Sequence, residues 1–262
     1  MDYKNILFEI TDNIGVITLN RPDEANSIHK PMVEELADIA MHCYRDDLIR
    51  SVVLTGSGKM FCGGGDLKAF VEQGDAVSNY VDQTATVLHQ SISRFARMDS
   101  PLVIAVNGVA AGGGFSLALA GDYIIAADTA KFISAYTASG LSPDGSSTFY
   151  LAKHIGLLRA KELILTNRLL SAEEACNWGM VTKVVPSESL LDEAMAMAQK
   201  FSNGPTKAYG ISKNLLNSAY SETLEAQLDS ESRGIASSMG NEDGRHGIDS
   251  FYKKKKPNFK GK

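Results

Sequence analysis

The stretch Leu102–Ala120, with the sequence LVIAVNGVAAGGGFSLALA, decides the predicted fold. It begins with five apolar residues, turns at Asn107-Gly108, and continues through three consecutive glycines into a second apolar segment. This order predicts a buried strand, a glycine-rich turn and a helix. A second stretch, Ser51–Leu67 (SVVLTGSGKMFCGGGDL), has the same order. Two successive strand–turn–helix units indicate a parallel sheet with crossover helices.

The flanking segments extend this alternation and end in helices. A hairpin is predicted at 6–20 around the turn at Asn13, and the region after Pro186 is predicted to be wholly helical. We therefore expect an α/β core at 1–200 and a helical region at 201–262. The other expected strands lie at 122–126, 131–133 and 181–185, and the other expected helices at 31–45, 79–95, from about 146, after the capping box at 171–174, and at 190–201, 206–219 and 221–238.

Composition narrows the class of protein. The chain has 262 residues, of which 44% are hydrophobic, enough for one sizeable core. Its net charge of −5 argues against nucleic acid as a partner. Three cysteines without a disulfide framework favour a reducing compartment, and the histidines have no metal-ligand spacing. With no secretory signal and no apolar run long enough to span a bilayer, we expect a cytoplasmic protein without a membrane partner or a metal.

The two glycine turns are the main candidate site. Neither matches the G-x-G-x-x-G dinucleotide fingerprint or the phosphate loop, so nucleotide binding is disfavoured. Glycines in such turns can serve tight geometry alone. Two turns in successive units can also present backbone N–H groups to one carbonyl oxygen, forming an oxyanion hole. That arrangement stabilises negative charge that develops on the oxygen during a reaction.

Four segments resemble motifs of the enoyl-CoA hydratase/isomerase, or crotonase, family. Phe61–Lys68 (FCGGGDLK) resembles F-[CS]-A-G-x-D-[IL], and Ala105–Gly114 (AVNGVAAGGG) resembles A-[IV]-N-G-x-[AC]-x-G-G-G. Leu19–Pro22 (LNRP) matches an early family motif, and Leu170–Val181 (LSAEEACNWGMV) resembles S-A-x-E-A-x-x-x-G-L-V. Together these segments are specific, and the resemblance covers nearly the whole chain.

The resemblance implies an α/β fold built as a spiral of ββα units, followed by a helical C-terminal trimerisation region. It implies a homotrimer or a dimer of trimers. A coenzyme A thioester would be the substrate, without a separate cofactor. The oxyanion donors would be the N–H groups of Gly65 and Gly113. The residues implied to bind CoA or substrate are Ala25, Cys62, Gly63, Asp66, Leu67, Tyr136, Leu141, Phe251 and Lys254.

The resemblance also bears on the acid–base group. Family hydratases use two glutamates, but the matching positions here hold Ser116 and Tyr136. A carboxylate follows at Asp144, in Gly140–Ser147 (GLSPDGSS). Pro-Asp-Gly is a common turn, and Asp also caps helices. The segment nevertheless resembles epoxyphenylacetyl-CoA isomerases and Δ3,Δ2-enoyl-CoA isomerases, in which this carboxylate is the single acid–base group. By that resemblance, Asp144 is the catalytic residue.

Several functions remain open from the sequence. The first hypothesis is an enoyl-CoA isomerase, in which one carboxylate removes and returns a proton. The second is an enoyl-CoA hydratase in which Asp144 compensates for the absent glutamates. A dehalogenase-like reaction would require a tryptophan near the acid, and the only tryptophan is Trp178. A non-catalytic acyl-CoA-binding protein is the alternative from another class.

Overall fold

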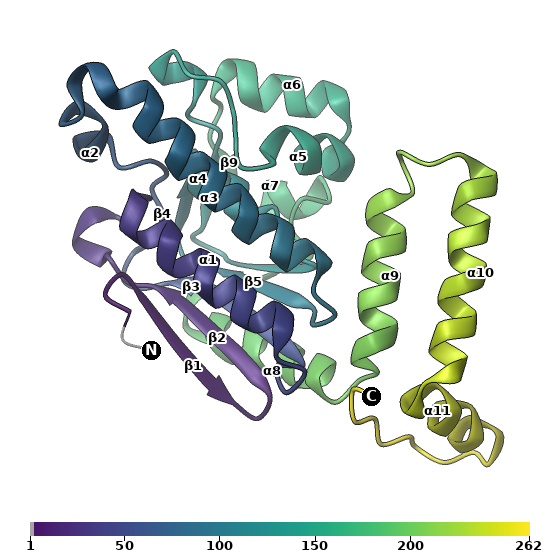
Figure 1. The fold of residues 1–262 in the computed structure, drawn as a ribbon. Helices are drawn as coiled ribbons and strands as arrows, with labels where there is room; N and C mark the ends of the chain where they lie inside the picture. Colours follow the sequence, from purple (N-terminus) through teal and green to yellow (C-terminus); the bar gives the residue numbers. More distant parts are fainter. Residues whose placement is uncertain (1–2) are drawn as a thin grey trace.

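The larger of two sheets forms the centre of the molecule (Figure 1). The computed structural model describes residues 3–262. The strand order is β1-β2-β3-β5-β7-β10. β1 and β2 pair antiparallel, as the predicted hairpin, and the other neighbouring strands are parallel. The strands span Ile6–Thr11 (β1), Ile14–Leu19 (β2), Ser51–Gly56 (β3), Leu102–Val106 (β5), Tyr123–Ala127 (β7) and Lys183–Val185 (β10).

A second sheet of short strands is ordered β4-β6-β8-β9. Three of its strands directly follow a strand of the larger sheet. Each of these repeats therefore contributes one strand to the larger sheet and the next strand to the smaller one. The corners between them require glycine: a Cβ on Gly56 would lie 2.4 Å from the Phe61 carbonyl oxygen, and one on Gly108 would lie 2.0 Å from that of Lys59. The expected spiral of ββα units is confirmed. The short strands span Met60–Cys62 (β4), Val109–Ala111 (β6), Lys131–Ile133 (β8) and Leu170–Ser171 (β9).

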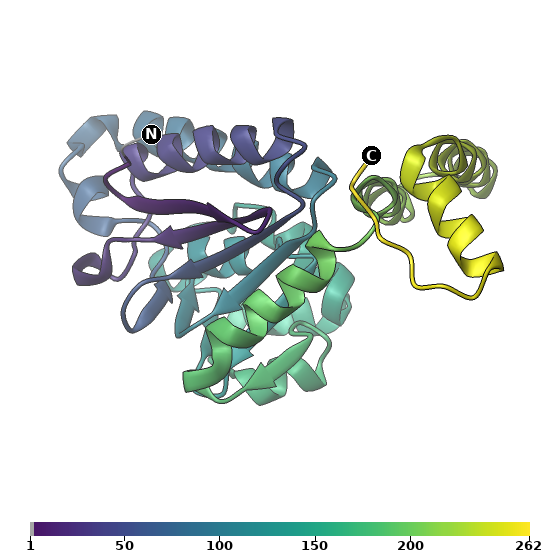
Figure 2. The ribbon, with the colours of Figure 1, turned by 90° about the horizontal axis from the view of Figure 1, so that it is seen from below.

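Helices cover both faces of the larger sheet. Figure 2 shows α1 (Lys30–Arg45) on one face and α8 (Leu190–Ser202) on the other. α1 buries the stripe that its period predicted, including Leu36, Ile39 and Cys43. Among residues 3–262, no helix is both long and apolar enough to span a lipid bilayer. The remaining core helices are α2 (Leu67–Val71), α3 (Val77–Arg97), α4 (Gly113–Ala118), α5 (Ser147–Ile155), α6 (Leu157–Thr166) and α7 (Ala172–Asn177).

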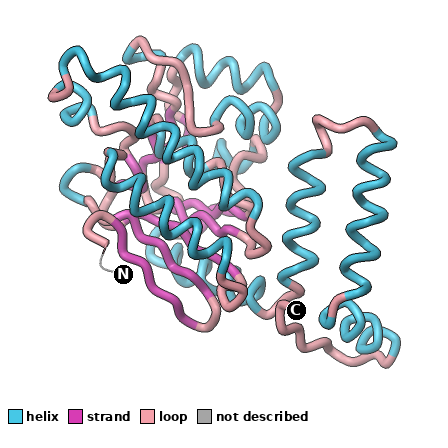
Figure 3. Tube along the Cα trace, viewed as in Figure 1, coloured by secondary structure: helices cyan, strands magenta, loops and turns pink. Residues whose placement is uncertain are grey.

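Three C-terminal helices stand beside this core, and the segment from 206 to 262 that includes them has no strand (Figure 3). They are α9 (Thr206–Ser218), α10 (Leu224–Gly240) and α11 (Glu242–Tyr252). Lys213 of α9 fastens them to the core, because its buried Nζ lies 2.6 Å from Asp122 Oδ2. It also donates to two backbone carbonyls of the core. α10 and α11 leave large apolar side chains exposed, namely Leu224, Leu228, Ile235, Met239, Ile248 and Phe251.

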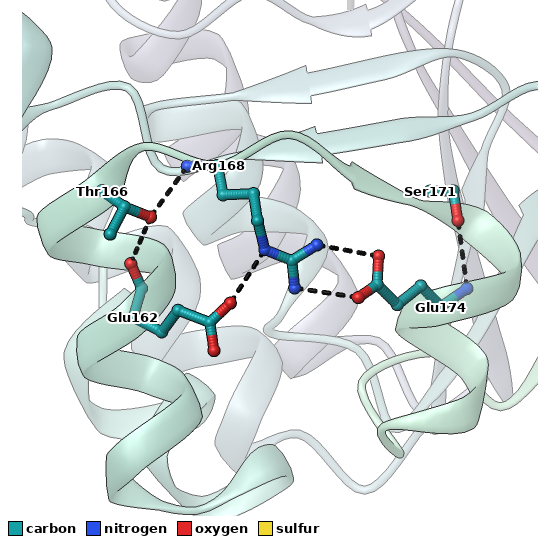
Figure 4. A network of polar contacts seen from close by, with 5 residues as sticks. All are labelled: Glu162, Thr166, Arg168, Ser171 and Glu174. Atoms are coloured by element: carbon teal, nitrogen blue, oxygen red, sulfur yellow. Dashed lines mark hydrogen bonds and ion pairs between the residues drawn. The ribbon is translucent and has the colours of Figure 1, made fainter.

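Two local predictions need correction. The strand expected at 181–185 begins only at Lys183, because the N–H groups of Met180 and Val181 both bond to the Ala175 carbonyl and close α7. The capping box is half formed. Ser171 Oγ accepts from the Glu174 N–H at 3.2 Å, but the Glu174 carboxylate forms a bidentate pair with Arg168 instead (Figure 4). Glu162 also binds Arg168, so this network joins α6 to α7.

Candidate active site

The two glycine turns lie against each other. The parallel pairing of β4 with β6 brings them together. Gly64 and Gly112 have φ of +93° and +50°, a region that favours glycine. A Cβ on Gly64 would lie 2.9 Å from the Ala111 carbonyl oxygen and 3.3 Å from the Gly113 nitrogen. The two predicted turns therefore form one surface, and side chains larger than hydrogen would separate them.

The backbone N–H groups of Gly65 and Gly113 remain available to a ligand. Gly65 forms a bridge with Ile28, but its two hydrogen bonds use the Gly64 carbonyl and the Asp66 N–H. The N–H of Gly65 takes no part in it. Gly113 is the first residue of α4, where an N–H has no acceptor within the helix. Two such donors on adjoining turns can stabilise an anionic oxygen.

The residues around the first turn mostly hold it in shape. The Gly63 N–H donates to the Ala25 carbonyl at 2.8 Å. Asp66 caps α2 by accepting from the Ala69 N–H, and it pairs with Arg21 at 3.0 Å. Burial raises the pKa of Asp66, but the Ala69 N–H and the Arg21 guanidinium outweigh it and hold that pKa below its usual value. Asp66 therefore stays charged and ties the LNRP segment to the glycine turn.

Two further predicted residues differ in accessibility. Cys62 is fully buried, and burial raises the pKa of its thiol to about 12. Its side chain is therefore a protonated core group, and only its backbone could contact a ligand. Leu67, in contrast, is largely exposed at the start of α2.

Asp144 is held by two hydroxyl groups. Tyr136 Oη donates to Asp144 Oδ1 at 2.6 Å. Fully buried Ser116 places its Oγ 2.8 Å from Tyr136 Oη and 2.9 Å from the Asp144 carbonyl oxygen. Burial, together with the nearby Asp144 charge, raises the pKa of Tyr136 above its usual value, so the phenol keeps its proton and acts as the donor. From the two positions that carry glutamate in family hydratases, Tyr136 thus orients the Asp144 carboxylate and Ser116 holds the Asp144 backbone.

His89 is a site residue that the sequence did not reveal. It comes from the middle of α3, and its Nε2 lies 3.5 Å from Asp144 Oδ2. The Gly145 N–H donates to the same Nε2 at 3.1 Å. The same ring nitrogen is therefore in contact with both the Gly145 backbone and the Asp144 carboxylate. A lone histidine on a helix gives no local signal of this placement.

Tyr136 connects the two halves of the site. A Cβ on Gly113 would lie 4.0 Å from Tyr136 Oη, so the second glycine turn and Asp144 both lie close to this hydroxyl. Half-exposed Leu141 belongs to the loop between Tyr136 and Asp144. Within residues 3–262, no three His, Cys, Asp or Glu side chains are grouped as metal ligands.

Other predicted residues lie elsewhere in a single chain. Phe251 is in α11 and Lys254 follows it, and both views place α11 on the opposite side of the molecule from α2 (Figures 1 and 2). One chain therefore does not bring them to the glycine turns. The ring of Trp178 lies near the guanidinium groups of Arg159 and Arg168.

This fold places the protein among crotonase-like α/β proteins, and the site combines paired backbone donors with one carboxylate. Residues 9–262 match the family described as enoyl-CoA hydratase/isomerase. The chain belongs to that family and is an acyl-CoA-processing enzyme.

Similar proteins in the family carry more than one activity name. The chain is 39% identical to the 1,2-epoxyphenylacetyl-CoA isomerase of Escherichia coli, over 98% of both chains. It is 36% identical to a probable enoyl-CoA hydratase of Rhodobacter capsulatus, over the full length of both. The crystal structure of an enoyl-CoA hydratase from Polaromonas has a TM-score of 0.92 at 32% identity, and the match covers 97% of this chain and 99% of that one. These likenesses establish the family but not the reaction.

Proposed function

We propose that this protein is an enoyl-CoA isomerase that moves a double bond from C3 to C2 of an acyl-CoA. The observation that carries the proposal is the set of groups around Asp144. Ser116 and Tyr136 occupy the positions of the hydratase glutamates, and neither side chain can act as a carboxylate. Both instead hydrogen-bond to Asp144, which leaves one acidic group beside the paired N–H donors.

One carboxylate suffices for this reaction. The thioester carbonyl oxygen accepts hydrogen bonds from the N–H groups of Gly65 and Gly113. Asp144 removes a proton from C2, and the electron pair delocalises onto the carbonyl oxygen as a dienolate. The same carboxyl group then returns the proton to C4, so the double bond lies between C2 and C3 and nothing else is consumed. Losing one oxyanion donor typically lowers the rate by about 10²–10³.

The geometry assigns different roles to the two carboxylate oxygens. Oδ1 accepts the short hydrogen bond from Tyr136, so its lone pairs are partly occupied. Oδ2 lies on the side of His89 and has no hydrogen bond from Tyr136. The Asp144 side chain retains 34% of its exposure, which leaves room for substrate contact. We therefore assign proton transfer to Oδ2.

A second candidate function is hydration of a 2-enoyl-CoA. The observation that favours it is His89, whose imidazole Nε2 lies 3.5 Å from Asp144 Oδ2. An aspartate and a histidine together could orient and deprotonate a water, which the isomerase reaction does not need. A protein that binds acyl-CoA without catalysis is the remaining alternative.

The deciding experiment compares both reactions in one preparation. Isomerisation of a trans-3-enoyl-CoA is followed by the absorbance of the conjugated product, alongside hydration of crotonyl-CoA. Asp144→Asn is the test variant, and Asp82→Asn, at an exposed position on α3, is the matched control. We expect fast isomerisation that Asp144→Asn abolishes and Asp82→Asn retains. Faster hydration would establish the hydratase, and acyl-CoA binding without either reaction would establish the binding protein.

We further propose a trimer or a dimer of trimers that works in the cytoplasm. The exposed apolar side chains of α10 and α11 support assembly, because a contact between copies would bury them. In such an assembly, Phe251 and Lys254 could reach the CoA bound to a neighbouring copy. The three free cysteines suit a reducing compartment. Light scattering on the purified protein would give the number of subunits.

A further inference from the structure

A groove of about 550 Å³ begins beside the candidate acid–base pair. Three parts of the chain line it: the second half of α3, the start of α5, and α9 together with the turn that follows it. His89 lies at one end, and its Nε2 is 3.5 Å from Asp144 Oδ2. Ser146, two residues after Asp144, also lines the groove. The groove therefore adjoins the site at Asp144.

The contacts define an order along which a substrate would lie. Gly113 lies close to Tyr136 Oη, Tyr136 binds Asp144, Asp144 is next to His89, and His89 opens into the groove. A thioester carbonyl at the glycine turns would place C2 to C4 near Asp144. The rest of the acyl chain would then pass His89 and enter the groove.

α3 supplies one wall of the groove and sets its length. His89, Ile92, Ser93, Ala96 and Arg97 follow the i, i+3, i+4, i+7, i+8 spacing of a single helix face. Eight residues of helix correspond to about 12 Å. Ile92 and Ala96 form an apolar floor, and Phe149 of α5 lies among the facing residues. An extended acyl chain suits a groove of this length and lining.

The described side chains that line the groove include a positive charge but no negative one. None of the described residues that line it is acidic, whereas Arg97 carries a positive charge. Arg97 is exposed in the last turn of α3, and among residues 3–262 its guanidinium forms no ion pair or side-chain hydrogen bond. Asn217 and Ser218 of α9 add polar groups to the groove. The end farthest from His89 therefore offers an unpaired cation and hydrogen-bonding groups rather than a purely apolar tip.

We propose that this groove binds the distal part of the acyl chain and that Arg97 binds a carboxylate at its end. The substrate class is then a CoA thioester of a dicarboxylic acid, with the second carboxylate unesterified. Guanidinium groups bind carboxylates through two parallel N–H···O bonds, which gives both affinity and orientation. Helix side chains lean toward the N-terminus, so Arg97 would reach back along the groove toward His89. This proposal rests on the isomerase function and specifies its substrate.

The test uses pairs of trans-3-enoyl-CoA substrates of equal length that end in a methyl group or a carboxylate. A groove about 12 Å long calls for chains of about six to about twelve carbons. Arg97→Gln is the test variant. Arg45→Gln is the matched control, because Arg45 is also an exposed arginine in the last turn of a helix but lies outside the groove. Binding of the saturated acyl-CoA pairs is measured separately by calorimetry.

We expect wild type to prefer the carboxylate-ended chain by about tenfold in kcat/KM at the best length, as for one charge-assisted hydrogen-bonded contact. Arg97→Gln should remove that preference and leave the methyl-ended substrate unchanged, whereas Arg45→Gln should retain it. No preference in wild type, or an equal loss on both substrates in Arg97→Gln, would overturn the proposal. If no chain is isomerised, the proposed function fails, and the affinities for the saturated pairs still decide whether Arg97 recognises a carboxylate.

Discussion

Replacing Tyr136 by phenylalanine removes one hydroxyl and leaves the aromatic ring in place. The lost group is the donor to Asp144 Oδ1 at 2.6 Å and the neighbour of Ser116 Oγ at 2.8 Å. A hydrogen bond to a charged group typically contributes about 1.5–3 kcal/mol. The Asp144 side chain is 34% exposed, so water can replace part of this interaction, and we use the lower end, about 1.5 kcal/mol. That corresponds to roughly a tenfold reduction in rate.

The reduction should appear in kcat, with KM nearly unchanged. Tyr136 orients the carboxylate that moves the proton, whereas the thioester is bound elsewhere, by the glycine turns. The assay is steady-state isomerisation of a trans-3-enoyl-CoA by wild type and Tyr136→Phe.

Two results would refute this reasoning. An unchanged kcat would show that the hydroxyl does not orient the acid–base group. A higher KM with an unchanged kcat would instead make Tyr136 part of the substrate wall. Ser116→Ala is the companion variant: it keeps the Tyr136–Asp144 bond and should lower kcat less than Tyr136→Phe does.

Three further changes test the frame around the site. Gly114→Ala would place a Cβ 2.3 Å from the Cys62 carbonyl oxygen, a backbone atom that cannot move alone, and should lower the free energy of unfolding by about 3 kcal/mol in urea titration. Lys213→Met leaves the Asp122 carboxylate without its cation, and we expect a loss of about 3 kcal/mol, measured by thermal unfolding. The pKa of Tyr136 is raised in the folded state. The contribution of Tyr136 to the free energy of unfolding is therefore complete below about pH 10, and it declines at higher pH by up to about 1.4 kcal/mol per pH unit. Urea titration between about pH 9 and pH 11 should show a shallower decline in Tyr136→Phe than in wild type.

Local sequence patterns predicted individual strands and helices of this fold. The buried strands β3 and β5 were evident because β5 is a continuous apolar run and β3 is rich in β-branched residues, as suits a strand covered on both faces. The helix α1 was evident from its apolar stripe. Local patterns predicted the short strand β8 but not the second sheet, because β4 and β6 have three residues each, too few to show a period. Only their pairing across the ββα units makes them a sheet.

The candidate site divides in the same way. Both glycine turns and Asp144 were located by motif. The partners of Asp144 were not, because His89 comes from α3 and lies 55 positions earlier, and no local pattern connects the two. Ser116 was noticed only as a departure from the hydratase pattern, and Tyr136 both as a departure and as a residue implied to bind substrate. Their hydrogen bonds to Asp144 depend on the packing of α4 against the loop after β8. Tertiary packing therefore determines their roles.

Those two departures have a common physical consequence. Ser116 and Tyr136 are both within hydrogen-bonding distance of Asp144, so glutamates at these positions would bring further negative charges close to it. Two like charges about 4 Å apart repel by about 4 kcal/mol at an effective dielectric constant near 20. A site with three such carboxylates would have to protonate one or lose its order. Hydroxyl groups remove that repulsion: Tyr136 donates to the one carboxylate that remains, and Ser116 donates to the backbone carbonyl of the same residue. The arrangement therefore suits a reaction that needs a single proton carrier and no second carboxylate to activate water.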